Sequence, residues 1–131
     1  MLKIKRLLVS GSRTGITKEY VYSILSQYIF ETLRFGDAKG VDTFVHEYCH
    51  EFDIPHEEPW VPLWILYKKG AAIQRNKNMV ETLEQHDYGI CIWDGLSPGT
   101  KDTMTRLKHR KKLLKVHIQP TKHQTMEKYL Q

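Results

Sequence analysis

The sequence predicts an α/β fold: a single Rossmann-like domain, with a parallel sheet of about five strands and helices on both faces. Strand-like and helix-like segments alternate along the chain, a pattern typical of parallel strands joined by crossover helices. The chain has 131 residues, of which 40% are hydrophobic and 27% charged, as in a one-domain globular protein. We expect residues 1–119 to form this domain and residues 120–131 to form a polar C-terminal tail.

The first half of the chain predicts two strands and two helices. Residues 7–9 are a short apolar run that ends in a Ser-Gly-Ser turn, as a buried strand does. Thr17 is a suitable N-cap for a helix that reaches about residue 29, because apolar residues recur there at helical spacing. Residues 33–35 predict a second strand, and a second helix is expected to begin near Gly40.

Residues 54–67 are harder to assign. Residues 54–60 are weakly extended and contain two prolines, and we count them as a strand of the sheet. Residues 60–67 are apolar without a clear period, which leaves a lid, a helix and a dimer contact as open alternatives.

The last part of the chain predicts two more helices and two more strands. A helix is expected over residues 70–84, followed by the clearest strand of the sequence, residues 88–93. An Asp-Gly turn ends this strand. Thr100 is expected to cap a helix that reaches about residue 112, and residues 114–118 alternate as a last strand.

Composition limits the compartment and the partners. No apolar run approaches the roughly 20 residues that span a bilayer, so we expect a cytoplasmic protein without membrane contact. Cys49 and Cys91 are too few for a disulfide framework and are expected to be reduced core thiols. Short domains of this kind commonly pair, so a homodimer is also expected.

Positive charge gathers near the C-terminus. Residues 101–131 hold nine Lys or Arg against two acids, a net charge of +7, whereas residues 1–100 carry −2. Such a patch can contact nucleic-acid phosphates, but a solvated helix face is the more ordinary interpretation. The candidate phosphate contacts are Arg106, Lys108, Arg110, Lys111, Lys112 and Lys115.

Four loops at or near the expected sheet edge carry small and polar residues suited to an anion. In folds of this class ligands bind beyond the carboxyl ends of the strands, at the point where the strand order reverses. Glycines let the backbone approach a phosphate, and hydroxyls, guanidinium groups and helix N-termini can bind it. The four loops are residues 11–15, 36–42, 70–76 and 94–100.

The aspartates and tryptophans of these segments have two interpretations each. Asp42 and Asp94 can bind a ribose hydroxyl or a base edge, or they can serve as ordinary helix-start and turn residues. Trp60 and Trp93 can stack on a base, although aromatic residues beside a sheet belong more often to the core.

The ordered set of motifs resembles the SLOG superfamily, and within it the small bacterial and phage branch named after YspA. The resemblance covers about residues 7–116. The superfamily also contains the "lonely guy" phosphoribohydrolases and the DNA-processing protein A fold. The motifs are Gly11-Ser12-Arg13, Gly36-Asp37-Ala38-Lys39-Gly40-Val41-Asp42, Gly70-Ala71 with Arg75-Asn76 and Met79, and Asp94-Gly95 with Ser97, Gly99-Thr100 and Thr103.

The resemblance implies a Rossmann-like domain that senses or processes a nucleotide-derived ligand. In the phosphoribohydrolases an arginine at the position of Arg75 is catalytic. Their second catalytic residue is a glutamate, and Thr103 holds that position here. Without that carboxylate, no obvious group assists cleavage of the glycosidic bond. We therefore regard a nucleotide hydrolase, with Arg75 and either Asp94 or Asp42 as its catalytic pair, as the alternative to a binding protein.

A rival motif is His46-Glu47-Tyr48-Cys49-His50, which has the His-Glu-x-x-His pattern of zinc enzymes. Two histidines four residues apart share a helix face, but no third ligand is obvious there in the sequence. Because short motifs match often by chance, we expect surface histidines, no metal and no cofactor.

The sequence thus predicts a nucleotide or nucleotide-derived ligand at the carboxyl edge of the sheet. Arg75 is expected to pair with the anion, Asn76 to hold the neighbouring loop and Asp42 to bind ribose. The expected ligand-binding residues are Gly11, Ser12, Arg13, Gly36, Lys39, Gly40, Asp42, Arg75, Asn76, Asp94, Gly95, Ser97, Gly99, Thr100 and Thr103.

Overall fold

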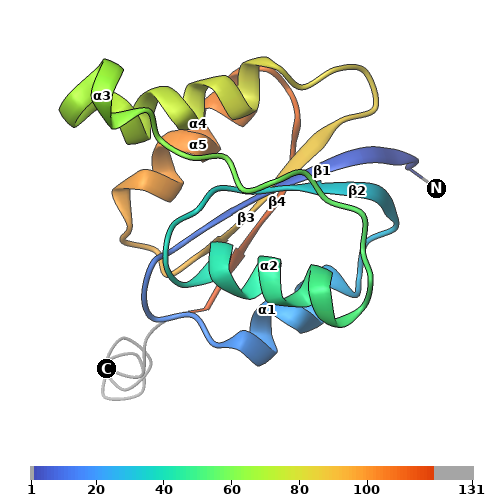
Figure 1. Cartoon of the computed structure of the whole chain (residues 1–131). Coiled ribbons are helices and arrows are strands. Elements are labelled where there is room, and N and C mark those ends of the chain that lie inside the picture. The colour runs from blue at the N-terminus through green and yellow to red at the C-terminus, as the bar shows by residue number, and fades with distance from the viewer. Residues whose placement is uncertain (1, 120–131) are drawn as a thin grey trace, which may run out of the picture.

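Four parallel strands form the sheet of the protein (Figure 1), in a computed structural model that describes residues 2–119. The strand order is β2-β1-β3-β4, and every neighbouring pair is parallel. The predicted α/β class is therefore confirmed, with four strands where about five were expected. Their bounds are β1 Ile4–Gly11, β2 Phe30–Arg34, β3 Tyr88–Trp93 and β4 Leu113–Ile118.

The missing fifth strand is the segment of residues 54–60. It runs along the outer edge of β2, but it does not form a continuous ladder. Its two prolines, Pro55 and Pro59, have no N–H to donate and so interrupt strand pairing. The segment is therefore held by two isolated bridges, Leu33 with His56 and Gly36 with Trp60.

The four main helices cover the two faces of the sheet in pairs (Figure 1). Helices α1 (Lys18–Leu25) and α2 (Val41–Glu51) lie on one face, and α4 (Ala71–Glu81) and α5 (Pro98–His109) lie on the other. The expected N-cap Thr17 is confirmed: its Oγ1 accepts a 3.2 Å hydrogen bond from the N–H of Tyr20.

Each face of the sheet has its own hydrophobic core. The larger core lies under α1 and α2 and includes the fully buried Phe35. The smaller one lies under α4 and α5. Cys49 belongs to the first core and Cys91 to the second, both as free thiols, and burial raises the pKa of each to about 12. The prediction of unpaired core thiols is confirmed.

The unassigned segment of residues 60–67 ends in a short helix, α3 (Trp64–Tyr67). A 3-10 turn, Lys68–Gly70, connects α3 to α4. Most side chains of this region are apolar and exposed, Ile65 to 95%. The expected homodimer stays a prediction. Among the described residues, no helix has both the length and the apolar character needed to cross a bilayer.

The strand order fixes one reversal point in the sheet. The chain passes from β1 outward to β2, and then returns to the other side of β1 as β3. The carboxyl ends of β1 and β3 are therefore adjacent, with Gly11 paired to Ile92. The connections that leave these two ends diverge to opposite faces of the sheet, and a ligand site is expected in the space between them.

Candidate functional site

A cleft of about 510 Å³ opens at this reversal point. Its walls come from the end of β1, the start of α2, one face of α4 and the first turn of α5. Four loops that are far apart in the sequence thus reach one cavity. Eight of the expected ligand-binding residues line it: Gly11, Arg13, Asp42, Arg75, Asn76, Ser97, Gly99 and Thr100.

The other seven expected residues lie outside the cleft lining. Several of them support the walls, as the following contacts show, whereas Lys39 is exposed beside the cleft. Thr103 is fully buried in α5, where its hydroxyl donates to the carbonyl of Gly99 at 3.4 Å. The residues outside the lining are Ser12, Gly36, Lys39, Gly40, Asp94, Gly95 and Thr103.

Asp42 is a buried carboxyl group on the cleft wall. It lies in the first turn of α2, and its Oδ2 accepts a 3.1 Å hydrogen bond from the N–H of Ala38. Burial raises the pKa of Asp42 to about 6, against the opposing effects of this N–H and of the nearby Arg75. A carboxyl with this pKa exchanges its proton near neutral pH, which suits a proton donor or acceptor.

Arg75 projects from α4 into the same wall. Its Nη1 donates to Oδ1 of Asp37 at 3.0 Å and to the carbonyl of Trp60 at 3.1 Å, and its Nε donates to Asn76. A charged arginine near a helix start needs either an acid or a ligand anion as its partner. Asp37 is this partner in part, and within residues 2–119 the Nη2 group of Arg75 has no hydrogen-bond partner.

Asn76 connects α4 to the start of α5. Its Nδ2 lies 3.5 Å from the carbonyl of Gly99 and 3.4 Å from Oδ2 of Asp102, while its Oδ1 accepts from Arg75. These long hydrogen bonds are the contacts expected of a residue that holds the neighbouring loop. Asn76 therefore places the Arg75 guanidinium and the first turn of α5 on the same cavity.

Two glycines allow the groups around Asp42 to approach each other. A Cβ atom at Gly36 would lie 2.5 Å from Nη1 of Arg75 and 2.9 Å from Oδ2 of Asp42. Gly40 has φ +76°, and a Cβ there would collide with the backbone carbonyls of Ser12 and Arg13. Gly40 therefore requires glycine, whereas a side chain at Gly36 would displace the ends of Arg75 and Asp42; both positions act on the site without lining it.

Asp94 stabilises the turn that follows β3 through hydrogen bonds within that turn. Asp94 accepts hydrogen bonds from the N–H groups of Leu96 and Ser97, at 2.8 and 2.9 Å, and from the Ser97 hydroxyl. Burial favours the neutral acid, but these bonds outweigh it and lower the pKa of Asp94 below its ordinary value. The Ser12 hydroxyl accepts from the N–H of Asp94, which joins the ends of β1 and β3.

The N-terminus of α5 faces the cleft without a side-chain cap. Ser97 occupies the N-cap position, yet its hydroxyl is bonded to Asp94 and accepts nothing from the helix. In the described part of the chain, the N–H groups of Gly99 and Thr100 have no hydrogen-bond acceptor. A helix start of this kind favours a bound anion through its free N–H groups and its dipole.

The expected ligand-binding residues left out several uncharged cleft residues, although the motif set includes Ala38 and Met79. Thr14 adds an exposed hydroxyl beside Arg13, and Ala38, Ala72 and Met79 shape the cavity. Residues 70–76 were counted among the segments suited to an anion, but their spacing gave no sign of which face of α4 meets the cleft. Arg13 itself is exposed, and it forms no ion pair with any acid of residues 2–119.

The two tryptophans considered for base stacking are engaged inside the protein. The guanidinium carbon of Arg34 lies 4.4 Å from the centre of a Trp60 ring, and the indole N–H of Trp60 donates to Glu57. Trp93 donates its indole N–H to the carbonyl of Ser97 and packs on the smaller core. Their contacts favour the packing interpretation over stacking on a ligand.

The basic C-terminal residues are partly used for internal contacts. Arg106 pairs with Asp102, and Arg110 donates to the last carbonyls of α4 at Val80 and to Leu83. Lys112 donates to two backbone carbonyls in the loop before β3, those of Glu84 and Asp87. Three of the six candidate phosphate contacts thus stabilise helix ends and loops, which weakens the case for nucleic-acid binding.

No family model matches the chain, and neither does any curated protein or solved structure with which it was compared. Any proposal about its function therefore rests on the geometry of the cleft and on the motifs themselves.

Proposed function

We propose that the cleft binds the phosphate of a nucleotide or nucleotide-derived ligand, and that the chain is a SLOG-type domain of the kind its motifs resemble. One observation carries this proposal: the uncapped N-terminus of α5 and the side chains of Arg13 and Arg75 line the same cavity at the reversal point of the sheet. Free N–H groups and guanidinium groups together are the donors that phosphate oxygens accept. Asp42 would accept a hydrogen bond from a ribose hydroxyl.

Nucleotide binding by purified protein tests this proposal. Isothermal titration with a panel of nucleoside mono- and diphosphates should find a ligand, and Arg13→Ala should weaken it roughly 10- to 100-fold through loss of a charge-assisted bond. Arg13 is the cleaner variant, because Arg75 also holds Asp37 and the Trp60 carbonyl.

Lys39→Ala is the matched control for this experiment. Lys39 is also an exposed cation near the cleft, but it does not line the cavity. Its variant should bind as the wild type does. Equal weakening by Arg13→Ala and Lys39→Ala would show general electrostatic attraction instead of a defined site, and a panel without any ligand would remove the proposal.

A second candidate function is hydrolysis of the N-glycosidic bond of such a ligand. The observation that favours it is the position of Asp42, a buried acid with a pKa of about 6 on the cleft wall. The Asp42 carboxyl would donate its proton to the leaving base. Water would add its hydroxyl to the anomeric carbon of the ribose, and its remaining proton would return to the carboxylate.

Incubation with nucleoside monophosphates and detection of free base distinguishes the two functions. If the protein is a hydrolase, Asp42→Asn should lower turnover by at least about 100-fold and leave binding in place. The rate should also fall as pH rises past about 6, where Asp42 loses its proton. Asp94→Asn is the control, because that carboxylate is bonded to its own turn. Nucleotide binding without release of free base would mean that the protein binds the ligand as a sensor.

A further inference from the structure

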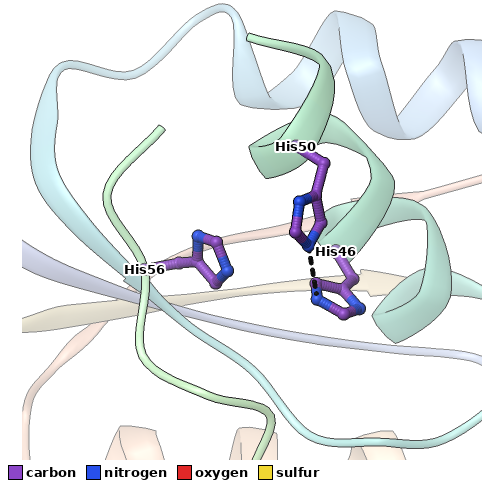
Figure 2. Close-up of side chains that lie close together, drawn as sticks. All are labelled: His46, His50 and His56. Carbon is purple, nitrogen blue, oxygen red and sulfur yellow. Dashed lines mark hydrogen bonds between the residues drawn. The ribbon is translucent and has the colours of Figure 1, made fainter. Parts of the chain in front are cut away.

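Three histidines that are separate in the sequence meet at the edge of the sheet, away from the cleft lining. His46 and His50 lie one turn apart on α2, and His56 lies on the segment that borders β2. Figure 2 shows the three imidazole rings turned toward a common space. Each ring offers a nitrogen, and the three nitrogens lie within 4.8 Å of one another.

The hydrogen bond of His56 leaves one of its ring nitrogens available for a metal ion. The Nδ1 of His56 lies 2.9 Å from the carbonyl of Ile54, so it carries the proton and donates it. The Nε2 of His56 then keeps a free lone pair. A histidine fixed in this way by a backbone carbonyl is the usual arrangement of a metal ligand.

The other two histidines already bring their nitrogens together. The Nε2 atoms of His46 and His50 share a 3.0 Å hydrogen bond (Figure 2), so one of them carries a proton that a metal ion would displace. Two nitrogens on a tetrahedral zinc ion with bonds of about 2.0–2.1 Å are separated by about 3.3 Å. A small rotation of either ring therefore admits an ion between them.

The surroundings of the cluster suit an open metal site. The buried ring of Phe35 lies under His46 and His56, with centroid distances of 5.7 and 5.9 Å, and orients both rings. His50 is exposed, so one side of the cluster faces solvent. Three protein ligands leave the fourth position of a tetrahedral zinc ion to a water molecule.

The glutamate of the His-Glu-x-x-His motif points away from this cluster. Glu47 forms an ion pair with Lys18 of α1 at 3.3 Å, on another side of α2. It therefore does not lie over the histidines as the general base of a zinc protease would. The third ligand that the motif lacked in the sequence is supplied by His56, which the fold brings beside α2.

We propose that His46, His50 and His56 form a binding site for a borderline divalent transition-metal ion, with Zn²⁺ as the preferred ion. Imidazole nitrogens are the ligands that such ions favour over Mg²⁺ and Ca²⁺. The ion would join α2 to the segment of residues 54–60, which otherwise borders the sheet through two isolated bridges and the ion pairs of Glu57 with Arg34 and Arg6. Its role is to fix this segment in place, and Glu47 takes no part in it.

Zinc titration of the tag-free, chelator-treated chain tests the proposal. We expect one Zn²⁺ per chain and a rise in thermal midpoint, since the ion binds the folded protein. Co²⁺ should give the strong visible absorption of a four-coordinate site. His56→Ala should lower Zn²⁺ affinity by at least tenfold, because it removes the ligand that the helix pair lacks.

Two further variants separate this site from general histidine binding. His50→Ala should give the same loss; because His50 is exposed, the variant should keep its fold, and circular dichroism checks this. His109→Ala removes an exposed histidine of α5 and should leave affinity unchanged. The proposal is overturned if the wild type binds no Zn²⁺ or if His56→Ala binds it as tightly as the wild type. Nucleotide binding is measured separately, so either proposal can fail alone.

Discussion

Asp42 and Asp94 are two aspartates that follow parallel strands at the same edge of the sheet, and the structure uses them in opposite ways. Asp94 is bonded by the turn in which it lies, and those bonds lower its pKa. Asp42 is buried on the cleft wall with one backbone donor from Ala38, and burial raises its pKa to about 6. From the sequence alone, both aspartates had the same two interpretations: a partner of ribose or a base edge, or an ordinary helix-start or turn residue.

The difference shows which feature decides the role of a carboxylate in such a loop. The carboxylate of Asp94 accepts hydrogen bonds from two N–H groups of its own tight turn, so its hydrogen bonds are local. Asp42 lies one residue into a helix, and its surroundings come from β1, the loop after β2 and α4. Local bonding makes Asp94 a structural residue. The long-range burial of Asp42 leaves it a group that exchanges its proton near pH 6.

The largest expected effect comes from a substitution at Gly40, which directly precedes the helix that carries Asp42. Gly40→Ala should destabilise the protein by about 2–4 kcal/mol, because residue 40 has a positive φ and its Cβ would collide with two backbone carbonyls. Chemical denaturation measures the change.

Gly99→Ala is the matched control in the first turn of α5. A Cβ at Gly99 meets no atom within 4 Å, and alanine favours a helix, so this variant should be neutral or more stable by up to about 1 kcal/mol. Equal stability of the two variants would contradict the account of the Gly40 position.

The pH dependence of stability gives the next effect. The pKa of Asp42 rises from an ordinary 3.8 to about 6 on folding, so the folded protein holds this proton more tightly than the unfolded chain does. The free energy of unfolding should therefore fall as pH rises from about 4 to about 6, by an amount on the order of 2–3 kcal/mol from this group.

Asp42→Asn isolates this contribution. Wild type and variant share every other titrating group. The difference between their free energies of unfolding at pH 4, 5, 6 and 7 therefore reports Asp42. The variant should gain stability relative to the wild type across that window. Parallel curves would mean that the carboxyl is not buried as the structure places it.

Much of the fold was predictable from local pattern. The alternation of strands and helices gave the α/β class, Thr17 identified the start of α1, and the apolar run of residues 88–93 matched β3. The prediction of a fifth strand at residues 54–60 was wrong, because an extended segment with two prolines resembles a strand in hydropathy but cannot form a continuous ladder. Residues 120–131, predicted as a polar tail, lie outside the described residues.

The candidate sites were predictable only where neighbouring residues build them. The loops at the strand ends identified six cleft residues, because the carboxyl ends of parallel strands share one edge, whereas Arg75 and Asn76 lie on α4. The support given by Gly36 and Gly40 depends on how distant elements pack. The histidine cluster was missed for the same reason: His46 and His50 are visible as a helix pair, but only β2 brings His56 beside them.

The smallest expected effect on stability comes from a substitution of Asp94. Asp94→Asn keeps one acceptor oxygen but loses the charge, so it should cost about 1 kcal/mol of stability at pH 7. Because folding lowers the pKa of Asp94, its contribution is present above the unfolded value and disappears as pH falls through the folded one. The gap between wild type and this variant should therefore close in acid. Relative stability then changes with pH in opposite directions for Asp42→Asn and Asp94→Asn, and two curves of the same sign would refute the distinction between the two loops.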